Sequence, residues 1–221
     1  MRFFGGHRER RERDNARNDL VKVVRNELKN ASHRRDQDEG EQAHQFVCED
    51  SLQYIWTLPR IQVLSKGSTW DNPEWQSYAL SDFKKILSTL VWIRWDNWEK
   101  FQTMFLNHRD ADNIYDRKDS NIPFRTNLQS LLTVEFRSDF LRDQYIFIPV
   151  ELREEGRFPS TKQLEFSQQY RMPMKESIKI GEGGQGIVYK ELVAAKHFRN
   201  EHGHLVTEVT TRRFIRKSTA N

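Results

Sequence analysis

Three glycines near the end of the chain have a spacing that lets a backbone approach phosphate groups closely. Residues 180–189 read I-G-E-G-G-Q-G-I-V-Y, with glycines 181, 183 and 186 in a G-x-G-x-x-G pattern. In a dinucleotide-binding fold a helix begins directly after the last glycine, and its N–H groups hold the pyrophosphate. Here Ile187, Val188 and Tyr189 follow, and β-branched and aromatic residues favour a strand. The pattern therefore predicts a glycine-rich turn between two antiparallel strands.

A glycine loop of this kind covers the phosphates of ATP in protein kinases. Residues 180–190, I-G-E-G-G-Q-G-I-V-Y-K, resemble that loop at the glycines and hydrophobic positions. They differ at Gln185, where kinases usually carry an aromatic or small residue. The resemblance implies Ser/Thr phosphoryl transfer from ATP with Mg in full-length relatives. It also implies a nucleotide-binding set on this hairpin: Ile180, Gly181, Gly183, Gly184, Gly186 and Val188.

Kinases also place a lysine on the third strand, in a V-A-x-K pattern, to hold the α- and β-phosphates. Residues 193–196, V-A-A-K, match that pattern and end at Lys196, whereas residues 209–212, V-T-T-R, fit loosely and end at Arg212. In a kinase the alanine of this pattern faces the valine after the glycine loop. For Lys196 the chain would have to reverse near Glu191, where turn residues are absent.

For Arg212, Thr210 would face Val188 and the reversal would fall at residues 199–203, where Asn200 and Gly203 favour a turn. We therefore expect Arg212 in the lysine's place, on a third strand at about 205–215 that follows a second strand at 186–198. Lys196 would lie in solvent near the outer end of the hairpin. The string V-T-T-R-R-F also resembles V-A-C-K-R-F of related kinases.

The rest of the kinase machinery is not in this sequence. It contains no H-R-D and no D-F-G string, and a kinase domain needs about 250 residues. The resemblance thus covers only the opening strands of a small lobe in a truncated or mispredicted chain. We expect no catalytic residue, no metal site and no bound cofactor in these residues alone. The alternative is a non-catalytic interaction protein, in which the helical module binds a partner and the hairpin is vestigial.

Composition indicates much solvated surface, and the pattern of a helical module followed by short strands predicts an α+β protein. The 221 residues are 36% hydrophobic and 31% charged, with a mean hydropathy of −0.86 and a net charge of +4. Cys48 is the only cysteine, which excludes an internal disulfide. No apolar run approaches the roughly 18 residues of a membrane helix, and the charged start is not a secretory signal. We expect an intracellular protein, cytoplasmic or nuclear.

The hydrophobic pattern predicts four regions. Residues 1–45 read as a charged, partly disordered arm with a solvated helix near 14–30, and 46–152 as a helical module. Residues 153–176 read as a linker, and 177–217 as the small-lobe fragment. In the module, the apolar repeat from Leu80 to Ile93 predicts a helix that continues through the tryptophans. Its side chains Trp95, Trp98 and Phe101 would form buried core.

Parts of the module resemble the region ahead of the kinase domain in fungal kinase-like proteins. The residues that carry this likeness are 93–101 (I-R-W-D-N-W-E-K-F), 121–124 (N-I-P-F) and 144–150 (Q-Y-I-F-I-P-V). The likeness assigns the module no chemistry. Residues 144–150 are rich in β formers, so we expect them to form a short strand or an extended tail.

Two further patterns suggest binding sites, but a solvated surface explains each of them better. His108, Asp110 and Asp112 could supply metal ligands, yet their spacing fits no known metal loop. Basic residues near the start could contact nucleic-acid phosphates, but acids are interleaved with them, which weakens that attraction. The contacts would be Arg8, Arg10, Arg11 and Arg13. We therefore do not expect a nucleic-acid partner.

Overall fold

The computed structural model describes residues 5–34, 45–107, 118–124, 132–153, 170–183 and 186–216. The chain divides into two units. Residues 1–31 and 50–147 form what we call the helical unit, and residues 32–49 and 148–221 form the sheet unit. Helices in the first and antiparallel strands in the second confirm the expected α+β fold class. The expected boundaries at residues 45 and 152 differ from this division, because residues 32–49 belong to the sheet unit although they lie between the two parts of the helical unit.

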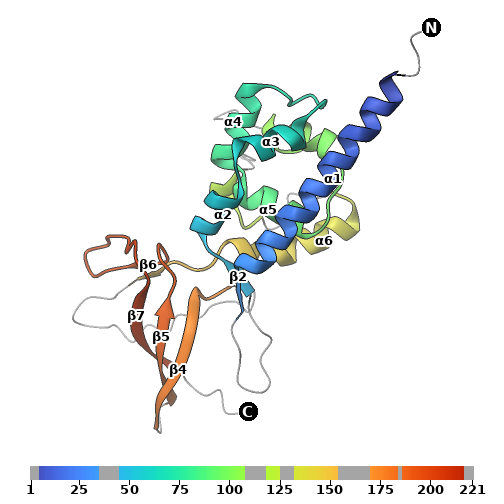
Figure 1. Cartoon of the computed structure of the whole chain (residues 1–221). Coiled ribbons are helices and arrows are strands. Elements are labelled where there is room, and N and C mark those ends of the chain that lie inside the picture. The colour runs from blue at the N-terminus through green and yellow to red at the C-terminus, as the bar shows by residue number, and fades with distance from the viewer. Residues whose placement is uncertain are drawn as a thin grey trace. The chain divides into compact units, whose positions relative to one another are not determined.

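Among the described residues, the helical unit has six α-helices and four short 3₁₀ or π segments (Figure 1). The α-helices are α1 (Gly5–Ala31), α2 (Glu49–Ile55), α3 (Leu58–Ser65), α4 (Pro73–Asp82), α5 (Lys84–Trp92) and α6 (Val134–Asp143). The short segments are η1 (Trp98–Lys100), η2 (Gln102–Leu106), η3 (Asp119–Asn121) and η4 (Gln144–Phe147).

The first helix is part of this unit's core. It runs along α3 and α5, and Val24 and Leu28 are fully buried (Figure 1). The predicted helix near 14–30 is therefore confirmed, but the expectation that it is solvated was wrong. The apolar stripe is narrow, but the long stem of the buried Arg17 extends the packed face towards the N-terminus.

Aromatic side chains fill the interior, as the sequence predicted. Trp95, Trp98 and Phe101 are buried, and the rings of Trp95 and Trp98 meet edge to face at 5.1 Å. Buried indole N–H groups find acceptors: Trp56 donates to Ser88 at 2.8 Å and Trp70 to the carbonyl of Trp98 at 3.0 Å. The indole rings of Trp56 and Trp70 are thus buried with their N–H donors satisfied.

These aromatics do not lie on one continuous helix, contrary to the prediction. The helix α5 ends at Trp92, and Arg94 adopts a left-handed φ of 62°. The N–H of Arg94 donates to the carbonyl of Val91 at 3.2 Å, and that of Trp95 to Leu90 at 2.9 Å. This is the Schellman hydrogen-bond pattern, which closes a helix around a left-handed residue. The sequence signal was hidden because an arginine occupies the position where glycine is usual.

The N-terminus of α5 is capped by a residue far away in sequence. Both carboxylate oxygens of Asp119 accept backbone N–H groups of α5, from Lys85 at 2.8 Å and Ile86 at 3.0 Å. These donors have no partner within the helix, and the carboxylate also complements the positive end of the helix dipole. Asp119, an acid of the segment considered for metal binding, therefore has a structural role.

The side chain of Gln144 joins two of the segments that resemble fungal kinase-like proteins. Its amide exchanges hydrogen bonds with the backbone of Phe124, donating at 2.9 Å and accepting at 2.8 Å. The ring of Phe124 also stacks on Phe140, at 6.0 Å between centroids. Residues 144–147 form the 3₁₀ segment η4, so the expectation of a short strand or an extended tail over 144–150 was wrong for these four residues.

The sheet unit contains three small sheets. The main one has the order β4 (Met174–Gly183), β5 (Gly186–Val193), β7 (Thr210–Arg216), all antiparallel. The strand β3 (Leu152–Arg153) pairs in parallel with β6 (Phe198–Arg199), and β1 (Ser32–Arg34) pairs antiparallel with β2 (Gln45–Val47). The predicted linker 153–176 thus contains the start of β4, and its Met172 and Met174 pack with Leu152, Val193 and Phe198.

A second, smaller core holds the β1–β2 pair in this unit. Phe46 and Cys48 are buried against Ala194. The ring of His33 lies 5.2 Å from that of Phe46. Burial lowers the pKa of His33 below its ordinary value of 6.5, and the positive charge of Lys175 adds to the effect.

We predict that replacing Arg94 by glycine stabilises the protein by roughly 0.5–1 kcal/mol. Glycine adopts the left-handed conformation without strain, which outweighs its larger entropy when unfolded. Chemical denaturation measures the difference. Arg94→Ala is the control: it removes the charge that repels the half-buried Arg25 but keeps the strained backbone. An alanine variant as stable as the glycine variant would show that charge is the cause.

We predict that Asp119→Ala destabilises the helical unit by about 1–2 kcal/mol, because the cap of α5 is lost. Thermal or urea unfolding followed by tryptophan fluorescence provides the measurement. Ser120→Ala, at the exposed neighbouring position, is the matched control and should behave like the unmodified chain. Equal stability of the two variants would mean that the cap contributes nothing.

We predict that the free energy of unfolding falls as the pH drops below about 6.5. The folded state holds the pKa of His33 below its unfolded value, so protons bind preferentially to the unfolded chain in this range. Melting temperatures at pH 7.5 and 5.5 should differ less in His33→Phe, which keeps a ring against Phe46. In His202→Phe, at an exposed site, the dependence should be unchanged. An unchanged dependence in His33→Phe contradicts the assignment.

Candidate functional site

The glycine-rich segment forms a hairpin between β4 and β5. Gly183 pairs with Gly186, Glu182 with Ile187 and Gly181 with Val188. The chain after Gly186 is a strand, which confirms the expected turn between antiparallel strands and excludes a dinucleotide-binding helix at this position. Gly184, one of the predicted nucleotide contacts, lies outside the described residues together with Gln185.

The fold itself does not require glycine at 181 or 183. Neither residue has a left-handed φ, and a Cβ built on either would meet no atom within 4 Å. Gly186 differs, because its φ of 137° is one that side chains rarely adopt. Since glycine weakens a strand, two glycines in open space suggest that another molecule approaches this backbone closely.

A β-bulge lies next to the glycines. Lys179 pairs with Tyr189 and Gly181 with Val188, so Ile180 is an extra residue on β4. Ile180 is 48% exposed and Ile178 is 54% exposed. Ile178 pairs with Lys190, two residues from Val188, so Ile178 and Val188 lie on the same face of the sheet. This face, which we call the Val188 face, is open, and it presents Ile178 and Val188 together with the exposed Lys190 and Glu176.

The third strand has a different register from the one predicted. Val188 pairs with Ile215, five residues beyond Thr210, and Thr210 pairs with Val193. An odd shift moves every side chain to the other face. Arg212 therefore pairs with Glu191 on the opposite face, with its guanidinium carbon 4.3 Å from the centre of the Phe198 ring. The expectation that Arg212 takes the place of the kinase lysine is wrong in this register.

The cause is the path of the chain between β5 and β7. The second strand ends at Val193, and the chain then forms a turn, β6 and a second turn before β7 begins. The predicted turn residues do form that second turn: Gly203 has a φ of 76°, and its N–H donates to the carbonyl of Asn200 at 2.8 Å. The turn was right, but it does not join the two long strands directly.

Lys196 is not on a strand either. It lies in the first turn with a φ of 61°, and its N–H donates to the carbonyl of Val206 at 2.8 Å. In the kinase pattern one residue of the third strand lies opposite the valine that follows the glycine loop, and the lysine comes two positions after that residue. Counting from Ile215 gives Lys217, which lies outside the described residues.

Ion pairs hold both ends of this region. Lys179 and Glu182 pair at 2.7 Å beside the glycines. Arg199 on β6 donates to Glu151 at 2.6 Å, and this hydrogen bond lowers the pKa of Glu151. The Glu151 carboxylate is therefore ionised near neutral pH and ties β6 to the residue before β3.

The other predicted sites are resolved differently. His108, Asp110 and Asp112 lie outside the described residues, and the described part of the chain shows no group of three or more potential metal ligands. Within the same described part, no helix combines the length and apolarity needed to span a bilayer.

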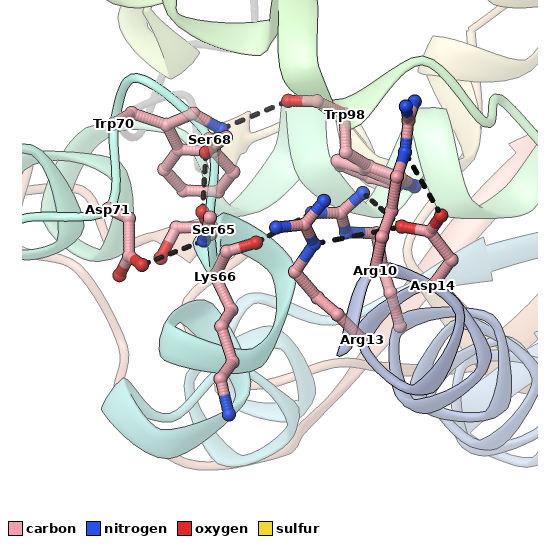
Figure 2. Close-up of polar contacts among 11 residues, drawn as sticks. Arg10, Arg13, Asp14, Ser65, Lys66, Ser68, Trp70, Asp71 and Trp98 are labelled. Atoms are coloured by element: carbon pink, nitrogen blue, oxygen red, sulfur yellow. Dashed lines mark hydrogen bonds and ion pairs between the residues drawn. The ribbon is translucent and has the colours of Figure 1, made fainter. Parts of the chain in front are cut away.

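The basic residues of α1 lie close to acids of the same helix. Arg8 pairs with Glu12 at 2.9 Å, and Arg10 and Arg13 lie 3.9 and 3.8 Å from Asp14 (Figure 2). Arg11 is exposed. Figure 2 also shows that Arg13 is turned towards the loop after α3, so it is part of the helical unit's internal contacts.

Comparison of the chain with protein-family models, with curated proteins and with solved structures found no match in any of the three.

Proposed function

We propose that β4, β5 and β7 are the opening strands of a protein-kinase-like small lobe, and that the glycine hairpin covers the phosphate groups of ATP. The observation that carries this proposal is the open space around Gly181 and Gly183. Backbone N–H groups bind phosphate oxygens only where no side chain intervenes, and these two positions leave the backbone bare.

The open Val188 face supports the same function. Ile178 and Val188 lie on this face near the glycines, on the side where an adenine ring would lie in the kinase arrangement. Such a surface is costly to leave in water, and a planar aromatic ligand would cover it.

We do not propose phosphoryl transfer by these 221 residues. The sequence contains no H-R-D or D-F-G string, so the groups that act as base and bind Mg in kinases have no counterpart here. The hairpin supplies one wall of a nucleotide site, and its affinity alone is expected in the millimolar range, where contact is transient.

Nucleotide contact at the hairpin can be tested by amide NMR. We predict that millimolar Mg-ATP shifts the amide signals of Gly181, Gly183 and Gly186, and that adenosine, which lacks phosphates, does not. In Gly183→Val these shifts should disappear while the melting temperature stays equal or rises, because valine favours a strand and has space here.

Glu176→Val provides the matched control. It places the same side chain at an exposed position of β4 away from the glycines, and it should keep the response to Mg-ATP. Absence of amide shifts in the unmodified chain at 10 mM Mg-ATP (roughly ten times a millimolar Kd) would reject the hairpin as a phosphate-binding element.

A further inference from the structure

Three guanidinium groups on α1 share one carboxylate where the helix meets the loop after α3 (Figure 2). Arg10 and Arg13 lie 3.9 and 3.8 Å from Asp14, and Arg17 lies 3.7 Å from it. Charge-assisted hydrogen bonds are shorter, at about 2.7–2.9 Å. Asp14 therefore attracts all three arginines at a distance without fully satisfying any of them.

The positive charge at this place is poorly compensated. The side chain of Arg17 is only 7% exposed, and its Nη2 donates to the carbonyl of Lys66 at 3.0 Å. The Nε atoms of Arg13 and Arg17 are buried without a hydrogen-bond partner among the described residues. Burial lowers the pKa of Arg17, and the attraction of Asp14 is opposed by the repulsion of Arg13.

Nearby acids do not remove this excess. Glu99 attracts Arg17 more weakly than Asp14 does. Asp71 faces the other side of the loop, where it accepts the N–H of Gly67 at 2.7 Å and the amide of Gln76 at 3.1 Å (Figure 2). Among the ion pairs of the described residues, these three arginines thus share the single carboxylate of Asp14.

At the loop, the backbone of Gly67 covers part of this charge. The guanidinium of Arg13 lies against the backbone of Gly67, so closely that a Cβ there would come within 2.0 Å of Nη1. Gly67 has a left-handed φ of 72° and is itself exposed. The side chain of Arg10 is 66% exposed and that of Arg13 is 23% exposed, so solvent reaches Arg10 directly and Arg13 in part.

We propose that Arg10 and Arg13, with the buried charge of Arg17 behind them, bind a phosphate group, either free or as a phosphomonoester. Guanidinium groups match phosphate oxygens in pairs, and a dianion would supply the acceptors that Asp14 alone does not. The site is built entirely from the helical unit, so it is separate from the glycine hairpin. The mixed charges of α1 disfavour a longer polyanion such as nucleic acid.

Melting temperature in phosphate against chloride, at equal ionic strength, tests this site. We predict that 5–20 mM phosphate raises the melting temperature by about 2–5 °C, since a ligand of the folded state stabilises it. The rise should be lost in Arg13→Gln and in Arg10→Gln. Because the Arg10 side chain is exposed, misfolding would not explain the loss in Arg10→Gln. It should persist in Arg11→Gln, which removes the same charge from an exposed position of the same helix.

Two controls separate the alternatives. Phosphate also stabilises proteins generally by exclusion from their surface, and that effect would be equal in all variants, which would overturn the proposal. Phenyl phosphate should act like phosphate, whereas dimethyl phosphate, a singly charged diester, should not. Equal effects of the two esters would contradict a monoester site. In Gly183→Val the rise should remain, so failure of the hairpin function and failure of this site are distinguishable.

Discussion

The register of the antiparallel β4-β5-β7 sheet decides which side chains can meet a ligand beside the glycine hairpin. Successive residues of a strand point to opposite faces, so the pairing of β5 with β4 and β7 assigns every residue to one face. The bulge at Ile180 is part of this assignment. Without that extra residue Gly183 would not face Gly186, and the two glycines would not close the hairpin opposite each other. The bulge thus places bare backbone and an apolar side chain at the same end of the sheet.

In the helical unit, the corresponding constraint is that buried helix ends need partners from distant parts of the chain. Asp119 caps α5 and Arg17 binds a carbonyl just after α3, each across more than thirty residues of sequence. Gln144 does the same for the backbone of Phe124. This contact joins residues 144–150 to residues 121–124, and it explains the glutamine at 144 by folding alone.

The sequence was sufficient where the signal was local. The strand after Gly186, the buried tryptophans and the turn at Asn200 and Gly203 follow from residue type and spacing, and the structure has them. It was insufficient where a distant contact or an unusual residue decides. Arg94 occupies the left-handed position after α5, where glycine is usual and would have indicated the helix end. The β-rich residues 144–147 form a 3₁₀ turn that begins at Gln144.

The error at Arg212 has the same origin and affects the candidate site most. A turn at Asn200 predicts where the chain reverses, but the length of the connection fixes the register, and β6 lengthens it. Turn chemistry therefore predicts that β5 and β7 pair but not which face Arg212 occupies. This uncertainty in register does not affect the glycines, because they belong to a hairpin whose two strands are consecutive in sequence.

The two phosphate-binding sites that we propose, at the hairpin and on α1, rest on different physics, which gives a way to tell them apart. At the hairpin, bare N–H groups would bind through short-range dipoles held in a fixed geometry. On α1, net guanidinium charge attracts anions over a distance that salt screens, with a Debye length of about 8 Å at physiological ionic strength. Raising the salt concentration therefore weakens the site on Arg10 and Arg13 more than contact at Gly181 and Gly183. If one anion site caused both phosphate responses, the two responses would show the same salt dependence.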